Sequence, residues 1–397
     1  MPLGLYVAVP FCRTKCTYCN FASDVFSRAV FEKYVTRLCA EIGQARETAQ
    51  RMGGLIESTV DSVYLGGGTP TLLDVTQLKS IFVTIGQNFN LLAEVEITVE
   101  CAPGTLSDAM VVALASCGVN RISLGVQSFV DKEAISVGRL HKREVVLDDI
   151  ARLRAAGLSN INLDLIAGLP HQTQRSWDES LNDLIATGVP HASVYMLEVD
   201  EDSRLGNELI AGGQKYHAHS VPNDDLIADL YQVACDRLNA AGIGQYEISN
   251  FGRTGFESKH NLKYWTRQPY LGFGGDAHSM LFSAIGQSAI RFANPDSLEK
   301  YVSAASSQPT YVSSQGALEE AFFLGLRLNR GIDLTKVAAE FGQDAVRSYS
   351  EIIAELTTAN LLERKADTVR LTARGRLLSN EVFEKFISIE ALAPVTK

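Results

Sequence analysis

The sequence of 397 residues predicts an α/β fold with a mostly parallel sheet and a smaller, mostly helical C-terminal part. In the N-terminal half, short β-branched or apolar runs alternate with segments of helical apolar spacing, in units of roughly 30 residues. After about residue 215 this alternation fades. Such units imply right-handed crossovers and a parallel sheet, either open and doubly wound or curled into a barrel.

Six strands are expected in the N-terminal part. They are the runs 5–9, 62–65, 94–100, 121–126, 161–166 and 192–197. Helical spacing is found between them at 31–45, 76–86, 143–157 and 176–188, and Gly157 and Gly188 stand where helix C-caps are expected. In open and barrel arrangements alike, functional groups gather at the carboxyl ends of the strands.

The remaining chain is predicted to be less regular. A helix is expected at 225–241, a loop region rich in glycine and aromatic residues at 251–280, and a mostly helical segment at 317–387. Within this last segment, a helix at 346–358, a short strand pair in LLERKADTVRLT and a helix at 373–387 follow the order of a small winged-helix-like unit. We therefore expect a core domain at 1–240 and a second domain at 241–397.

Charge and composition disfavour some classes of function. The net charge of -10 argues against nucleic acid as a partner, because its binding relies on Lys and Arg. No apolar run approaches the roughly 18 residues that span a bilayer, and the N-terminus lacks the basic region of a signal peptide. We expect a cytoplasmic protein without a transmembrane segment.

Three of the seven cysteines, Cys12, Cys16 and Cys19, follow the first predicted strand in the pattern C-x3-C-x2-C. Three thiolates on one loop can each bind one iron of a 4Fe-4S cluster and leave the fourth iron without a protein ligand. Zinc is the alternative metal, although a structural zinc site needs four Cys or His ligands and no second CxxC or HxxxH group is nearby. Plain core packing is the remaining alternative.

The other four cysteines have no such spacing. They are Cys39, Cys101, Cys117 and Cys235. We expect each of them to be a small, buried, hydrophobic residue.

The cysteine pattern after the first strand resembles the signature of the radical-SAM superfamily. The resemblance implies a partial, TIM-like barrel of six strand–helix units and S-adenosylmethionine (SAM) chelated to the open iron by its amino and carboxylate groups. In that family one electron from the reduced cluster cleaves SAM to methionine and a 5′-deoxyadenosyl radical. A reductant such as a flavodoxin or a ferredoxin is therefore implied as a partner.

Motifs at the other predicted strand ends narrow the resemblance to one branch, which contains the oxygen-independent coproporphyrinogen III oxidases and the HemW-type haem chaperones. They are LYVAVPFC, YLGGGTPT with its closely spaced glycines, and polar residues at the ends of later strands. The resemblance assigns SAM contacts to Tyr6, Gly67, Gly68, Thr69, Glu100, Gln127, Arg139 and Asp164. For each residue taken singly, a turn, capping or salt-bridge role is the alternative.

Two features favour the chaperones over the oxidases. Phe21 occupies a position at which the oxidases carry a further cysteine. The segment KHNLKYW (259–265) resembles the HNxxYW motif that the chaperones associate with haem. The motif implies that His260 ligates or contacts haem iron and that Tyr264 and Trp265 offer flat apolar surface. A hydrogen-bonded, structural histidine is the alternative.

The resemblance thus implies a haem chaperone that binds haem, a 4Fe-4S cluster and SAM and passes haem to an acceptor protein. A SAM-dependent oxidase of coproporphyrinogen III is the second hypothesis, and a radical-SAM protein with an unrelated substrate is the third. Four positions depart from the family pattern: Ala8, where histidine is usual, Asn20, Ala102 and Asp276. The sequence therefore leaves open whether the chain catalyses a reaction.

Overall fold

A twelve-stranded sheet forms the centre of the molecule in the computed structural model, which describes residues 1–286, 288–303 and 308–387. The strand order is β12-β11-β10-β9-β1-β2-β3-β4-β5-β6-β8-β7. The six expected strands lie side by side and parallel in the middle: β1 (Leu3–Val9), β2 (Thr59–Gly67), β3 (Asn90–Cys101), β4 (Arg121–Gln127), β5 (Ile161–Ala167) and β6 (His191–Met196). The predicted α/β fold is confirmed.

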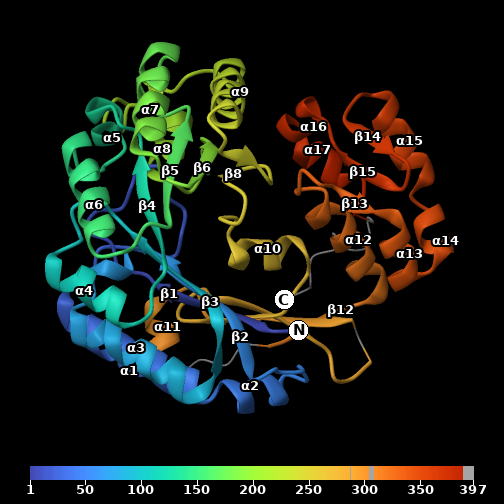
Figure 1. Ribbon diagram of the computed structural model, residues 1–397, viewed down its shortest axis with the longest axis horizontal. Coiled ribbons are helices and arrows are strands. Elements are labelled where there is room, and N and C mark those ends of the chain that lie inside the picture. The colour runs from blue at the N-terminus through green and yellow to red at the C-terminus, as the bar shows by residue number, and fades with distance from the viewer. Residues whose placement is uncertain (287, 304–307, 388–397) are drawn as a thin grey trace.

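Helices cover the outer face of these strands (Figure 1). They are α1 (Arg28–Gly43), α2 (Ala45–Arg51), α3 (Val75–Asn88), α4 (Asp108–Ser116), α5 (Asp131–Ser136), α6 (Arg143–Ala155), α7 (Gln174–Thr187) and α9 (Asp224–Ala240), with short 3-10 turns at Pro70–Leu72 and Ala218–Ser220. The helix α8 (Arg204–Ala211) lies instead beside the cysteine loop. Gly188 ends α7 in the left-handed conformation, with φ 66°, as expected of a C-cap glycine. The strands are buried on both faces, which explains their long apolar runs.

The chain after residue 240 extends both edges of the same sheet. β7 (Gly244–Gln245) and β8 (Asn250–Gly252) continue it antiparallel beyond β6. At the other edge β9 (Tyr270–Phe273) pairs parallel with β1, and β10 (His278–Phe282), β11 (Ala289–Ala293) and β12 (Thr310–Val312) follow, with α11 (Leu298–Val302) between the last two. In the described residues β12 and β7 end the sheet, which is therefore open.

The prediction of a loop region at 251–280 is wrong, because this segment contains α10 (Lys259–Trp265), β9 and part of β10. Strands this short carry too few residues to show a period of two, and their pairing partners lie far away in the sequence. The sheet also continues past residue 240, where we expected the core domain to end. That expected boundary is not a boundary of the sheet.

A second, smaller unit follows β12 and has a core of its own. It contains α12 (Ser314–Gly325), β13 (Ile332–Asp333), α13 (Leu334–Phe341), α14 (Gln343–Arg347), α15 (Ser350–Thr358), β14 (Leu362–Lys365), β15 (Thr368–Leu371), α16 (Ala373–Leu377) and α17 (Ser379–Glu384). Phe322 and Phe386 stack at its centre, with ring centroids 4.9 Å apart. The expected order of helix, strand pair and helix is present, although the last expected helix is divided near Leu378.

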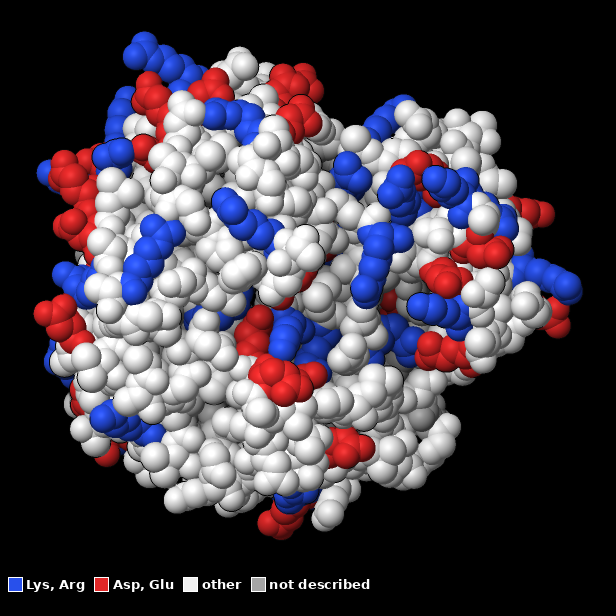
Figure 2. All heavy atoms as spheres, viewed as in Figure 1, with Lys and Arg blue, Asp and Glu red and all other residues white. Residues whose placement is uncertain are grey.

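This C-terminal unit, defined as residues 314–387, lies beside the open side of the curved sheet, and α10 lies between the two (Figure 1). Arg267, which follows α10, pairs with Glu340 of α13 at 2.9 Å and lies 3.8 Å from Glu320 of α12. Figure 2 shows Lys, Arg, Asp and Glu mixed over this face, with both signs gathered in the hollow between the two units. No helix in the described residues is both long enough and apolar enough to cross a membrane.

Candidate functional site

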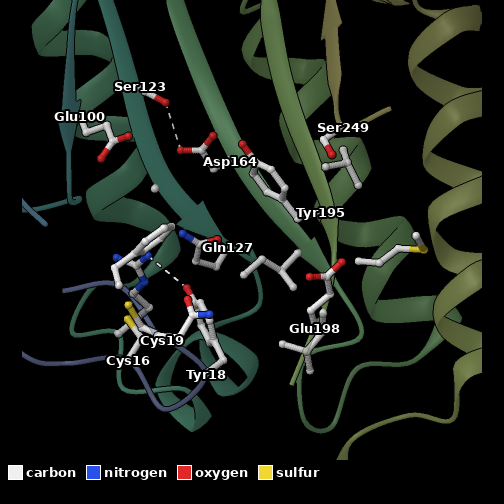
Figure 3. Close-up of a pocket in the computed structure, with 18 of the residues that line it drawn as sticks. Cys16, Tyr18, Cys19, Glu100, Ser123, Gln127, Asp164, Tyr195, Glu198 and Ser249 are labelled. Carbon is white, nitrogen blue, oxygen red and sulfur yellow. Dashed lines mark hydrogen bonds between the residues drawn. The ribbon is translucent and has the colours of Figure 1, made fainter. Parts of the chain in front are cut away.

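A cavity of about 1140 Å³ opens at the carboxyl ends of β2 to β6. The cysteine loop borders one side, and residues of the C-terminal unit, Leu377 to Glu381, also line it. Figure 3 shows Glu100 and Asp164 projecting from the strands towards the space above Cys16 and Cys19, with Tyr195 and Ser249 on the opposite side. The position agrees with the rule that parallel sheets present functional groups at their carboxyl ends.

The cysteine loop is held in place by distant segments. The Cys12 amide donates to the Asp24 carbonyl at 3.0 Å, and the Thr17 amide donates to the Val137 carbonyl at 3.2 Å. The amide of Leu205 in α8 donates in turn to the Thr17 carbonyl at 2.8 Å. Cys12, Cys16 and Cys19 are free, half-buried thiols that all line the cavity.

The donor set fits a 4Fe-4S cluster with one open iron. No group of three His, Cys, Asp or Glu side chains in the described part of the chain is suited to hold a single metal ion. A cluster makes a different demand, since each of its three thiolates binds a different iron and the sulfurs need not meet at one point. Burial raises the pKa of the Cys12 and Cys19 thiols, so iron has to displace their protons on binding.

The glycine loop at the end of β2 passes close to the end of β1. A Cβ added to Gly68 would lie 2.6 Å from the Val9 carbonyl oxygen and 2.8 Å from that of Phe11, and Gly67 has a φ of 94°. Both positions therefore need glycine. The Thr69 amide donates to the Phe11 carbonyl at 2.8 Å, which fixes the loop beside the cysteines.

Glu100 lies at the end of β3 and faces this loop. Its carboxylate accepts hydrogen bonds from the Tyr64 hydroxyl at 2.8 Å and from the Gly67 amide at 3.0 Å. Desolvation raises the pKa of Glu100 to about 7, although both hydrogen bonds oppose the shift. A carboxylate that burial has destabilised gains from a cationic ligand, such as the amino group of SAM.

Asp164 lies on β5, beside β4, and is held by side chains of the same layer. Asn162 Nδ2 donates to one carboxylate oxygen at 2.7 Å, and Ser123 Oγ donates to the other at 3.1 Å. Burial raises the pKa of Asp164, and these hydrogen bonds oppose the rise. The carboxylate is thus oriented before any ligand arrives.

Gln127 and Arg139 complete this wall of the cavity. The register of β4 against β5 shifts between Gly125 and Gln127, and Gln127 has a φ of 69°, which is rare for a residue with a side chain. Such irregularities are found preferentially at functional sites, where they re-aim a side chain. Arg139 donates to the Tyr18 hydroxyl at 3.3 Å and thereby joins the wall to the cysteine loop.

Tyr6 is not among the residues that line the cavity. It lies behind the glycine loop, paired with Tyr64 across β1 and β2 with ring centroids 6.1 Å apart. Its other aromatic neighbour is His260, at 6.3 Å. The structure thus brings together seven of the eight expected SAM residues and places Tyr6 one layer further in.

His260, Tyr264 and Trp265 do not line the cavity either. His260 is 1% exposed, and both ring nitrogens have protein partners: Ser62 Oγ lies 3.0 Å from Nδ1, and the Tyr264 hydroxyl lies 2.8 Å from Nε2. Desolvation lowers the pKa of His260 to about 3, so the imidazole is neutral. In this arrangement His260 has the hydrogen-bonded role that the sequence left as the alternative.

The rest of the KHNLKYW segment ties α10 to its surroundings. Lys263 is 2% exposed and lies 2.7 Å from Asp61 of β2. The Glu96 carboxylate of β3 accepts hydrogen bonds from the backbone amides of Lys259 and His260 at the start of the helix, each with an N–O distance of 3.1 Å. The guanidinium of Arg327 lies 4.3 Å from the ring centroid of Trp265. The motif therefore joins the sheet to the C-terminal unit.

Several cavity residues were not expected from the sequence. Ser123 and Tyr195 could have been found by strand alternation, whereas Arg327 and Leu378 carry no local signal because they reach the cavity from another unit. Of the four remaining cysteines, Cys101 and Cys235 are buried as expected, but Cys39 and Cys117 are only half-buried, since they lie on or next to outer helices. Phe21 lines the cavity with 65% of its surface exposed.

Comparisons with known proteins extend these observations. Residues 6–184 match the family model described as the radical SAM superfamily, and residues 312–378 match the HemN C-terminal domain. Haem chaperone HemW of Lactococcus lactis is 34% identical over 390 residues, which cover 97% of each chain. This chain belongs to the HemW family of radical SAM proteins. The HemW of Bacillus subtilis is 33% identical over 390 residues, and that of Escherichia coli is 30% identical over 400 residues, each covering at least 96% of both chains.

Solved structures support the fold of this HemW-family chain. Coproporphyrinogen III oxidase HemN from Escherichia coli, described as a radical SAM enzyme, superimposes with a TM-score of 0.82 over 97% of this chain and 90% of the oxidase. The sequence identity is 23%, so the likeness concerns the fold. Asp276, which the resemblance gives as a departure from the family pattern, has a φ of 59°, a conformation that glycine adopts more readily.

Proposed function

We propose that this protein is a haem chaperone, which binds haem, a 4Fe-4S cluster and SAM and delivers haem to an acceptor protein. The observation that carries the proposal is the likeness to haem chaperones along the whole chain, at 30–34% identity to the relatives from Lactococcus lactis, Bacillus subtilis and Escherichia coli. Phe21, in place of a further cysteine, agrees with it. A cytoplasmic location and a flavodoxin- or ferredoxin-type reductant are part of the same proposal.

Within the cavity, each group has a distinct task. Cys12, Cys16 and Cys19 hold the cluster, which supplies one-electron chemistry when it is bound. Gly67, Gly68 and Thr69 bring the backbone close to the methionine end of SAM. Glu100 accepts a hydrogen bond from the amino group of SAM. Gln127, Arg139 and Asp164 contact the remainder of SAM from β4, β5 and the segment between them. Tyr6 supports the glycine loop from behind.

The second candidate function is oxidation of coproporphyrinogen III, because HemN, which has a similar fold, is described as a coproporphyrinogen III oxidase. Two residues count against it. Ala8 offers a methyl group where the family pattern has an imidazole, so it can neither transfer a proton nor bind a propionate. Phe21 also departs from the oxidases. We therefore rank oxidation below haem delivery.

One experiment separates the two functions. The purified chain is reconstituted anaerobically with iron and sulfide, titrated with haem, and then incubated with coproporphyrinogen III, SAM and dithionite. Stoichiometric haem uptake without protoporphyrinogen formation supports the chaperone. Turnover of coproporphyrinogen III would overturn it in favour of the oxidase, and failure to take up haem would overturn it outright.

A further inference from the structure

The cavity extends beyond the expected SAM residues to a far side, where a group of apolar and aromatic side chains lies beside polar ones such as Glu198, Ser249 and Glu381. We use the name β6-side lining for Tyr195, Met196, Leu197, Ile248, Leu377 and Leu378, all of which line the cavity. These residues come from the end of β6, the segment before β8 and the C-terminal unit. Figure 3 shows Tyr195 across the cavity from Cys16 and Cys19.

The β6-side lining presents apolar and aromatic surface to the cavity. Tyr195 is 42% exposed, although it lies in a central strand of the sheet. Binding sites for flat apolar ligands are lined by such side chains, with a few polar groups that fix the orientation of the ligand. The lining suits a macrocycle, whereas SAM is accommodated by the polar residues at the ends of β2 to β5.

Arg327 lines the same cavity from the C-terminal unit. In the described residues its guanidinium makes no hydrogen bond or ion pair, and its Nε is buried without a partner. Its side-chain neighbours are the Trp265 ring, at 4.3 Å, and the buried carboxyl of Glu247, whose pKa is raised by burial against the opposing charge of Arg327. Arg327 thus interacts with Glu247 through its charge but forms no hydrogen bond with it, so guanidinium donors remain for an anionic ligand.

The other cations that line the cavity lie on the cysteine side, where each donates a hydrogen bond to a neutral oxygen, and Nε of Arg139 is, like that of Arg327, buried without a partner. Arg139 donates to the Tyr18 hydroxyl, Arg13 donates to the Gly104 carbonyl at 3.2 Å, and Lys15 donates to the Phe21 carbonyl at 3.2 Å. Among the described cavity residues, Arg327 is the cation that the C-terminal unit contributes, beside the β6-side lining. Its planar fork matches a carboxylate in two parallel hydrogen bonds.

We infer that Arg327 binds a propionate carboxylate of haem, with the macrocycle lying on the β6-side lining, and that Trp265 is a positioning residue that holds the guanidinium. The inference rests on the proposed function, because it requires that haem is the cargo. It also gives the tryptophan of the KHNLKYW segment a link to haem that does not need direct contact. The link runs from the Trp265 ring through Arg327 to the cavity.

Two porphyrins test the inference: haem, which carries free propionates, and its dimethyl ester, which carries none. The full-length, cluster-reconstituted protein is titrated with each, as wild type and as Arg327→Met, which removes the charge but keeps an apolar stem. We expect wild type to prefer haem over the ester by roughly 10- to 100-fold, the range of a charge-assisted hydrogen bond. Arg327→Met should lose that preference and leave ester binding unchanged.

Matched variants distinguish binding from folding. Arg330→Met removes a nearby charge that does not line the cavity, and it should behave as wild type. Arg327→Lys restores a charge without the fork and should recover part of the preference. Trp265→Leu should lower the preference for haem more than Trp265→Phe, which keeps an aromatic face. Equal thermal stability of the variants establishes that each is folded.

The outcomes separate the two levels of the proposal. If wild type binds haem and Arg327→Met keeps the wild-type preference for haem over its ester, the role of Arg327 is refuted and the chaperone proposal stands. The same conclusion follows if Arg330→Met loses as much preference as Arg327→Met. If wild type binds neither porphyrin, the proposed function fails, and the role of Arg327 fails with it.

Discussion

The Tyr264 hydroxyl lies 2.8 Å from Nε2 of His260, one turn away on the same helix. The second ring nitrogen lies 3.0 Å from Ser62 Oγ of β2. A neutral imidazole has one donor and one acceptor nitrogen, so these two contacts use its full hydrogen-bonding capacity. The histidine of the haem-associated motif thus joins α10 to the sheet.

We predict that His260→Ala leaves the Soret band of the haem-loaded protein unchanged but lowers stability by about 2–4 kcal/mol, the usual cost of removing a buried, hydrogen-bonded side chain. The measurements are haem absorption spectra and chemical denaturation. Tyr264→Phe is the control and should lose only the hydrogen bond. A shifted Soret band in His260→Ala but not in Tyr264→Phe would identify His260 as an iron ligand.

Glu100 gives the ligand-free protein a defined pH dependence. Its pKa is raised from 4.5 to about 7 in the folded state, chiefly by desolvation. Between these pH values the folded state binds more protons than the unfolded state. The contribution of Glu100 to the free energy of unfolding therefore falls as the pH rises from about 4.5 to 7. Above pH 7 the charged carboxylate destabilises the fold.

The free energy of unfolding of Glu100→Gln, taken relative to that of wild type, should therefore be greater at pH 8 than at pH 5, by roughly 1–3 kcal/mol. Urea denaturation of both proteins at the two pH values measures this difference, and all other titrating groups cancel in the comparison. The same variant should bind SAM more weakly, because an amide cannot pair with the amino group. A stability difference that is equal at both pH values would contradict the assignment.

The ion pair of the buried Lys263 and the half-buried Asp61 should respond asymmetrically to mutation. Asp61→Asn leaves an ammonium group that is 2% exposed without its counter-ion, and we expect a loss of about 3–5 kcal/mol. Lys263→Met should cost less, because the Asp61 side chain is 26% exposed and can be hydrated. The double variant should recover part of the loss. Additive losses in a double-mutant cycle would show that the pair is not coupled.

Replacement of any one of Cys12, Cys16 and Cys19 by alanine should abolish the visible absorbance of the reconstituted cluster, since each thiolate holds a different iron. Iron and sulfide analysis after anaerobic reconstitution provides the measurement. Cys117→Ala is the matched control, because this cysteine is half-buried but lies at the end of α4, outside the cavity. Full iron content in any of the three variants would refute the cluster assignment.

The sequence by itself determined the six central strands and the place of the cysteine loop. Both rest on local patterns: apolar runs of strand length, and three cysteines directly after the first of them. The glycines and acidic residues at later strand ends could likewise be placed at one edge, because all parallel strands present their carboxyl ends on the same side. Seven of the eight expected SAM residues accordingly line one cavity.

Only the tertiary structure decided the roles of the second half of the chain. The strands at the sheet edges are two to five residues long and are stabilised by partners far away in sequence, so no local period reveals them. His260 meets Ser62, and Trp265 meets Arg327, across separations that sequence spacing does not encode. A motif shows which residues occur together, but their burial and partners follow from how α10 packs between the sheet and the C-terminal unit.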